Sequence, residues 1–113
     1  MPASSVTWLD GIPASEMPLP DRGLDYGDGL FETLLLRRGR PLYTQIHLDR
    51  LARGFEALAF PDCLSAVAEQ LVTAAAFVAD RSWPWTALRI TVTRGEGHRG
   101  YAPPVHARPR VII

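Results

Sequence analysis

Residues 21–36, DRGLDYGDGLFETLLL, contain the transition that decides the fold. Glycine and aspartate, the residues that tight turns require, dominate residues 21–29, so this part is predicted to be a polar loop. Residues 30–36 are mainly apolar and are predicted to form a strand. The dipeptide Arg38-Gly39 then predicts a turn that brings the chain back through residues 40–43.

The residues before this stretch also indicate β-structure interrupted by turns. Residues 6–9 form a short apolar run that ends in Asp10-Gly11, a strong hairpin signal. The three prolines that follow predict an irregular segment of edge or loop character: Pro13, Pro18 and Pro20.

Two helices are predicted after this β-structure. The first has an apolar stripe at helical spacing, formed by Leu48, Leu51, Phe55 and Leu58. Pro61 is expected to end this helix, and Asp62 is expected to be the N-cap of the next one. The second helix has a wide apolar face: Leu64, Val67, Ala68, Leu71, Val72, Ala75 and Val78. Both helices are expected to cover one side of a sheet.

The C-terminal third of the sequence returns to β-structure. Leu88, Ile90 and Val92 alternate with polar residues, which is the two-residue period of a half-buried strand. A second glycine-rich loop follows at residues 94–101, and residues 108–113 begin another strand. We therefore expect an α+β fold, a mostly antiparallel sheet with two helices packed on one face, in a single domain over residues 1–113. The apolar end predicts a domain cut at a strand, or a fragment.

Composition excludes several classes of function. Twelve basic residues balance twelve acidic ones, so nothing favours nucleic acid or an anionic membrane as a partner. No apolar run approaches the ~20 residues of a membrane span, and the single cysteine, Cys63, suits a reducing compartment, so a cytoplasmic protein is expected. All basic residues are arginine, which excludes a Schiff-base lysine, a P-loop or a lysine general base in this chain. Cys63 itself is expected to be a small core residue.

The polar residues leave few candidates for chemistry. His47, His98 and His106 match no metal-ligand spacing, so no metal site is expected. Asp28, flanked by two glycines, is expected to make a turn. The loop at residues 94–101 has two interpretations: a site for a carboxylate or phosphate, built on its arginines, or a solvated hairpin loop.

Arg50 is the candidate anion ligand of the first predicted helix. It lies at the edge of the apolar stripe, one turn after His47 and one turn before Gly54. Glycine within a helix costs about 1 kcal/mol relative to alanine, so it usually marks a close approach. Beside a gap left by Gly54, Arg50 is placed to reach an anion at the rim of the core. The alternative is an arginine whose aliphatic stem covers apolar surface.

Three blocks of the sequence, taken in order, resemble the fold-type IV pyridoxal-phosphate (PLP) enzymes, the class IV aminotransferases. They are residues 21–33, the HLDRL segment at residues 47–51 with its His-x-x-Arg-Leu pattern, and TRGEGHRGY at residues 93–101. The Arg-Gly-Tyr ending of the third block is most like the aminodeoxychorismate lyases. The D-amino-acid enzymes tend to have a histidine where Tyr101 stands.

The resemblance implies a role for each matching residue. Arg50 matches the arginine that binds the cofactor phosphate, and Phe31 matches an aromatic residue that borders the substrate side of the site. Arg99 and Tyr101 match loop positions that contact the substrate carboxylate in relatives, often across the interface of a homodimer. The motif around Asp28 has a mainly structural role in the family.

The resemblance also implies what this chain lacks. The catalytic lysine of the family lies in a second, C-terminal domain, together with the glutamate that faces the pyridine nitrogen. These 113 residues resemble the N-terminal domain alone, so they are expected to contain no catalytic residue, to be inactive and not to retain PLP by themselves.

The expected reaction of the full-length parent is PLP-dependent elimination of pyruvate from 4-amino-4-deoxychorismate, which gives 4-aminobenzoate for folate synthesis. A D-amino-acid or branched-chain aminotransferase of the same fold is the alternative within the family. In another class, the alternative is a non-catalytic binding or assembly module.

Overall fold

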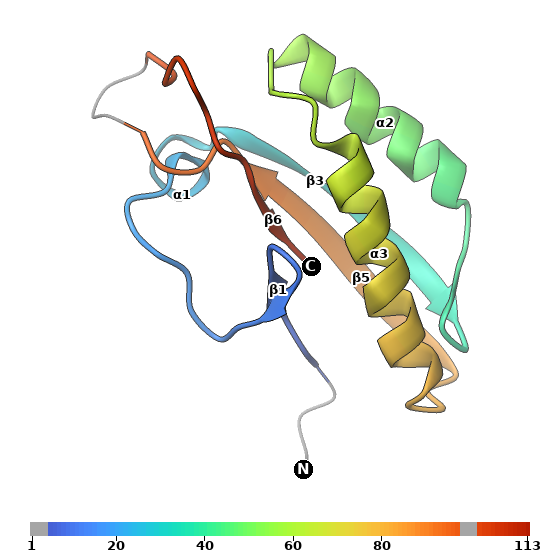
Figure 1. Ribbon diagram of the computed structural model, residues 1–113. Coiled ribbons are helices and arrows are strands. Elements are labelled where there is room, and N and C mark those ends of the chain that lie inside the picture. Colours follow the sequence, from blue (N-terminus) through green and yellow to red (C-terminus); the bar gives the residue numbers. More distant parts are fainter. Residues whose placement is uncertain (1–4, 98–101) are drawn as a thin grey trace.

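The protein forms one six-stranded antiparallel sheet with helices on one face (Figure 1). The structure is a computed structural model that describes residues 5–97 and 102–113. The strand order is β2-β1-β6-β5-β3-β4. The strands are β1 (Trp8–Leu9), β2 (Ile12–Pro13), β3 (Gly29–Arg37), β4 (Arg40–Pro41), β5 (Trp85–Thr93) and β6 (Arg110–Ile112).

The long β3–β5 ladder is the centre of the sheet. It runs from Gly29 opposite Thr93 to Arg37 opposite Trp85. Successive side chains of a strand point to opposite faces, and the apolar residues on one face of this ladder are buried. On the helix side these are Leu34, Leu36, Leu88, Ile90 and Val92. The predicted alternation over residues 88–93 is therefore confirmed.

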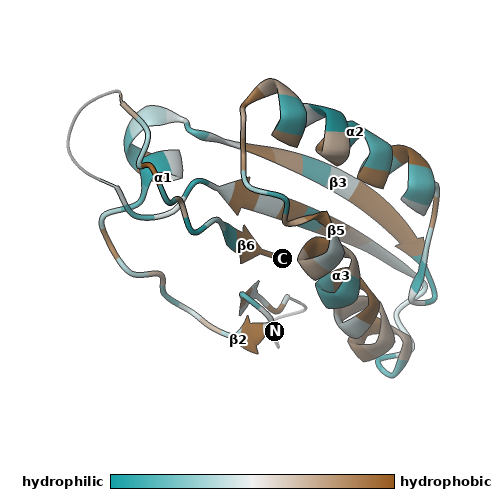
Figure 2. Ribbon diagram, turned by 45° about the horizontal axis from the view of Figure 1, so that its top comes forward, coloured by the Kyte–Doolittle hydropathy of each residue, from teal (hydrophilic) through white to brown (hydrophobic). Residues whose placement is uncertain are grey.

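Helices α2 (Thr44–Ala57) and α3 (Leu64–Ala79) cover the same face of the sheet (Figure 1). Helix α2 is amphipathic, with Leu51 and Phe55 buried against the sheet (Figure 2). Helix α3 buries a wider apolar face, which includes Val67, Leu71 and Val78. The predicted α+β fold, a mostly antiparallel sheet with two helices packed on one face, is confirmed.

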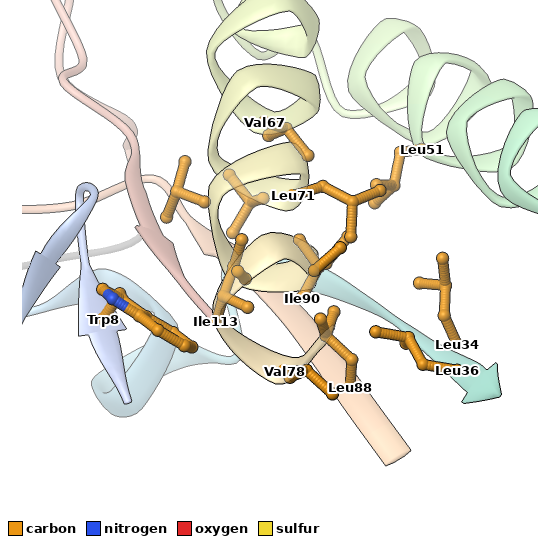
Figure 3. Packing of buried hydrophobic residues seen from close by; sticks show 14 of the residues in the cluster. Trp8, Leu34, Leu36, Leu51, Val67, Leu71, Val78, Leu88, Ile90 and Ile113 are labelled. Carbon is orange, nitrogen blue, oxygen red and sulfur yellow. The ribbon is translucent and has the colours of Figure 1, made fainter. Parts of the chain in front are cut away.

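The core lies between these two helices and the sheet (Figure 3). Leu34, Ile90 and Val67 are fully buried, and Trp8 closes the end of the core near the chain termini. The ring of Trp8 packs edge-on against Phe77 of α3, with a centroid separation of 5.3 Å.

A short helix that the sequence analysis missed, α1 (Arg22–Tyr26), lies within the segment predicted to be a loop. The side chain of Asp21 accepts a hydrogen bond from the Leu24 amide at 3.1 Å and so caps the first turn. Gly27 ends the helix in the left-handed conformation, with φ of +65°. The turn-forming residues at both ends were recognised, but the single helical turn between them is too short to show a period.

The start of α3 also differs from the prediction. Asp62 was the expected N-cap, but the N-cap residue is Cys63, which makes no side-chain capping bond. Asp62 instead accepts from the amide of Leu64, two residues on, at 3.3 Å. Cys63 is half-buried and packs against the core, as expected for a small apolar residue. Burial raises the pKa of its thiol above the ordinary 9.0, and the charge of Asp62 adds to the effect.

The first and last described segments of the chain pair with each other. The amide of Trp8 donates to the carbonyl of Ile113 at 2.8 Å, and the amide of Ile113 donates back at 3.0 Å. The predicted hairpin at Asp10-Gly11 joins β1 to β2, and the predicted strand near residue 110 is β6. Within residues 5–97 and 102–113, no helix is long and apolar enough to cross a membrane.

Candidate functional site

The candidate site lies where α2 crosses the N-terminal half of β3. Glu32 of β3 has a side chain only 8% exposed, and its two carboxylate oxygens bind two residues of α2. Oε1 forms an ion pair with Nε of Arg50 at 3.0 Å, and Oε2 lies 2.7 Å from Nδ1 of His47. The His-x-x-Arg spacing puts both partners on the same face of the helix, one turn apart. One carboxylate thereby joins the strand to the helix.

Arg50 keeps most of its hydrogen-bonding capacity in this arrangement. Its side chain is 60% exposed, and Glu32 is the only partner that it has among the described residues. Guanidinium has five N–H donors, so an ion pair through Nε leaves the terminal nitrogens to bind a ligand. An arginine with a fixed stem and free terminal donors suits a phosphate or a carboxylate.

Sequence analysis missed Glu32, although the sequence held a signal for it. A strand from residue 30 to residue 36 puts Glu32 on the same face as Leu30, Leu34 and Leu36. An acidic residue at the core-facing position of a strand must find a partner, because an unpaired buried charge is very costly. The expected strand and helix therefore already pointed to a cationic partner for Glu32.

The explanation given for Gly54 needs a correction. The sequence suggested a gap beside Arg50 that a ligand approaches, but the side chain of Leu30 fills that space. A Cβ on Gly54 would lie 2.5 Å from Cδ1 of Leu30. The glycine lets α2 approach β3 closely, and the candidate site depends on Arg50 and Glu32 rather than on a cavity at Gly54.

Phe31 lies on the opposite face of β3 from Glu32. Its ring is 56% exposed, and the guanidinium carbon of Arg89 on β5 lies 4.0 Å from the ring centroid. Phe31 and Arg50 therefore reach the same end of β3 but from different faces of the sheet. The other two predicted substrate-binding residues, Arg99 and Tyr101, lie outside the described residues.

Asp28 and Arg94 form a buried cluster rather than a ligand site. Oδ2 of Asp28 accepts from Nε of both Arg22 and Arg94 at 2.9 Å. Arg94 also donates to the carbonyl oxygens of Leu58 and Ala59 at the end of α2. Its side chain is only 8% exposed, so it is neither the anion ligand nor the solvated loop residue that the sequence left open. Asp28 was expected only to form a turn, but its carboxylate also joins Arg22 to Arg94.

Burial by itself would raise the pKa of Asp28, but the two arginines outweigh that effect. Their hydrogen bonds and positive charges bring the pKa of this carboxyl below its ordinary 3.8. The carboxylate is therefore charged at neutral pH and is held by two buried cations. As for metal ions, the described part of the chain has no group of three His, Cys, Asp or Glu residues able to hold one.

Comparison with known proteins gives the family. The family described as Amino-transferase class IV matches residues 29–113, which is more than half of the chain. The chain belongs to the class IV aminotransferases. The matched region of this class IV chain includes Glu32, His47 and Arg50.

Two aminodeoxychorismate lyases are among the proteins similar to the class IV chain. The lyase of Vibrio harveyi is 32% identical over 108 residues, which cover 94% of this chain and 38% of that protein. The crystal structure of the 4-amino-4-deoxychorismate lyase of Pseudomonas aeruginosa is 48% identical with a TM-score of 0.82, and the match covers 94% of this chain and 37% of that one.

A more distant structure shares the fold of the class IV chain. It is a hypothetical aminotransferase from Mycobacterium tuberculosis in a PLP-bound form, with 24% identity and a TM-score of 0.76. The match covers 96% of this chain and 38% of the other. The class IV chain thus spans less than half the length of each of these relatives.

The residues of the class IV chain fit one part of PLP, its phosphate. The side chain of Arg50 is 60% exposed and is paired with Glu32 through Nε, so its terminal nitrogens are suited to bind a phosphate dianion. The sequence contains no lysine, so these residues form no Schiff base with the cofactor.

Proposed function

We propose that this chain is the N-terminal domain of a PLP-dependent 4-amino-4-deoxychorismate lyase. The reaction eliminates pyruvate and leaves 4-aminobenzoate, a precursor for folate synthesis. The observation that supports this most directly is the exposed guanidinium of Arg50, held by Glu32, in a chain that is 48% identical to the Pseudomonas aeruginosa lyase.

The role of this chain's residues in the reaction is to bind and orient the cofactor and the substrate. Arg50 binds the cofactor phosphate through its terminal nitrogens. Phe31 borders the substrate, while Arg99 and Tyr101 bind a substrate carboxylate. PLP, when bound, supplies the electron sink for the bond cleavage. The lysine that moves the proton belongs to a second domain, so these 113 residues alone are inactive and do not retain PLP.

The assembly that we propose is a homodimer, because the loop with Arg99 and Tyr101 contacts the substrate across a dimer interface in relatives. We place the protein in the cytoplasm, since its single cysteine, Cys63, suits a reducing compartment. Light scattering on the purified protein tests the dimer.

A coupled assay on the full-length gene product that contains this chain tests the reaction. Pyruvate released from 4-amino-4-deoxychorismate without an amino acceptor supports the lyase. A reaction that proceeds only with a 2-oxo acid acceptor would instead identify a D-amino-acid or branched-chain aminotransferase.

The intact mass of the natural protein tests the remaining alternative, a non-catalytic binding or assembly module. A mass near 12.5 kDa would mean that the protein consists of this domain alone and would favour the module. A mass about twice as large or more would leave room for the domain with the lysine and would favour the enzyme.

Replacement of Arg50 tests the phosphate site itself. In the full-length protein, Arg50→Ala should weaken PLP binding several-fold or more, because the phosphate loses a charged bidentate donor. Arg53→Ala is the matched control, since Arg53 is exposed on the same helix but does not contact Glu32. Equal PLP affinity of the Arg50 variant and the wild type, measured by equilibrium dialysis, would refute the role.

A further inference from the structure

Burial of the Glu32 carboxylate on the core side of a strand costs free energy. Its carboxylate is buried on the core-facing side of β3, between Leu30 and Leu34 along the strand. A buried ion pair often contributes little net stability, because the loss of hydration offsets the attraction of the charges. A hydrophobic residue in the strand would serve the fold at least as well, so the stability of the fold does not by itself explain a glutamate here.

The contacts of Glu32 show what it does control. Each carboxylate oxygen has its own partner on α2, Nε of Arg50 for one and Nδ1 of His47 for the other. The ion pair with Arg50 is made at Nε, so the two terminal nitrogens of the guanidinium are not the atoms nearest to the carboxylate. The ion pair therefore limits the positions that the stem of Arg50 can take, while most of the side chain stays exposed.

Asp28 provides a comparison within the same molecule. Its carboxylate also contacts two basic side chains, but those of its partners Arg22 and Arg94 are only 5% and 8% exposed. The side chain of Arg50 is 60% exposed. Of these three arginines, only Arg50 is held by a carboxylate and still open to a ligand from solution.

We propose that Glu32 is the positioning residue of the anion site and that it presents Arg50, with His47 as a second support, to a phosphate monoester. The inference rests on the proposed function, because it takes the phosphate of PLP as the ligand. Restraint before binding lowers the entropy that the arginine loses when the phosphate binds, and this raises affinity.

The test compares PLP with pyridoxal, which lacks the phosphate, in the full-length gene product that contains this chain. Glu32→Gln keeps the shape of the side chain but removes the charge and one acceptor. We expect PLP affinity to fall about tenfold while pyridoxal affinity stays within about twofold of the wild type. Equal losses for both compounds, or no loss for either, would overturn the proposal.

Two controls separate positioning from folding. Asp28→Asn removes the charge of the other bridging carboxylate and should leave the ratio of PLP to pyridoxal affinity unchanged. In an Arg50→Ala background, Glu32→Gln should cause no further loss of PLP affinity, because its effect acts through Arg50. A full additional loss in that background would overturn the proposal.

Glu32→Asp serves if Glu32→Gln does not fold, since it keeps the buried charge but is too short to bridge both partners. It should show the same selective loss of PLP affinity, and failure of both variants to fold would overturn the proposal. The failures are distinguishable. If Arg50→Ala leaves PLP affinity unchanged, the proposed phosphate site is wrong. If Arg50→Ala lowers PLP affinity but Glu32→Gln does not, only the proposed role of Glu32 is refuted.

Discussion

Asp28 and Glu32 lie four residues apart and the carboxylate of each contacts two basic side chains, but their surroundings give them different effects. The partners of Asp28 are buried, and one of them, Arg94, also donates to the carbonyls of Leu58 and Ala59, directly after α2. The bonds of Asp28 therefore tie α1, β5 and the end of α2 together. Glu32 restrains a side chain that remains in solvent.

The Asp28 cluster should make stability depend on pH in the acid range. We expect Asp28→Asn to lower the free energy of unfolding by about 2 kcal/mol at pH 7, because two buried arginines lose their anion. The folded pKa of Asp28 lies below 3.8, so its contribution is complete above pH 3.8 and is lost as the pH falls through the folded value. The gap between wild type and variant in urea unfolding should therefore close below pH 3.8. A constant gap down to the lowest pH at which both proteins fold would contradict this.

At the scale of elements, the β3–β4 turn packs closely on the end of α3. Gly39 has φ of +79°, a conformation that favours glycine, and a Cβ there would lie 2.5 Å from Cα of Ala79. The sequence predicted the Arg38-Gly39 turn from local residue preferences. The contact with Ala79, forty residues further along the chain, needed the structure.

Gly39→Ala should therefore cost more than the conformational strain alone. We expect a loss of about 3 kcal/mol in the free energy of unfolding, of which about 1 kcal/mol comes from the positive φ and the rest from the clash. Gly27→Ala is the control, because Gly27 has φ of +65° and nothing within 4 Å of its would-be Cβ. Equal melting temperatures of the two variants in thermal denaturation would show that the β3–β4 turn can shift away from Ala79 without loss of stability.

At the scale of the whole molecule, β6 is the element that closes the sheet. It lies between β1 and β5 in the strand order, so it connects the N-terminal hairpin to the central ladder. Val111 faces the core and is 3% exposed, while its neighbour Ile112 is only partly buried and lies on the other face. The integrity of the sheet thus depends on residues at the two ends of the described chain.

Val111→Asp should disrupt this closure. A buried charge without a partner is expected to cost about 3 kcal/mol or more and to loosen the packing of Trp8. Ile112→Asp tests the same change on the other face and should cost less. Urea unfolding followed by circular dichroism, compared between the two variants, measures the difference in the free energy of unfolding. Equal destabilisation by both variants would mean that Val111 and Ile112 do not face opposite sides of the sheet as described.

The fold could be predicted largely because its signals are local. The alternation of Leu88, Ile90 and Val92, the stripe of Leu48, Leu51 and Phe55 and the turn at Asp10-Gly11 each depend on residues within a few positions of one another. The fourth residue of the predicted stripe, Leu58, follows the end of α2 and is 42% exposed. Local signals failed at α1, where one helical turn shows no period, and at Asp62, whose carboxylate bonds two residues on instead of capping the helix.

The sequence by itself determined the α+β fold, the family and Arg50 as the candidate phosphate ligand. It singled out Arg50 by its place at the edge of the apolar stripe, but it could not show how exposed Arg50 is compared with Arg22 and Arg94. Only the tertiary structure decided which of them is open to a ligand. Burial and pairing settle that difference, and the partners lie far apart in sequence: Asp28 and Arg94 are 66 positions apart. Because an unpaired charge in the core is costly, Arg22 and Arg94 are buried together with their partner Asp28, whereas the side chain of Arg50 is paired and still 60% exposed.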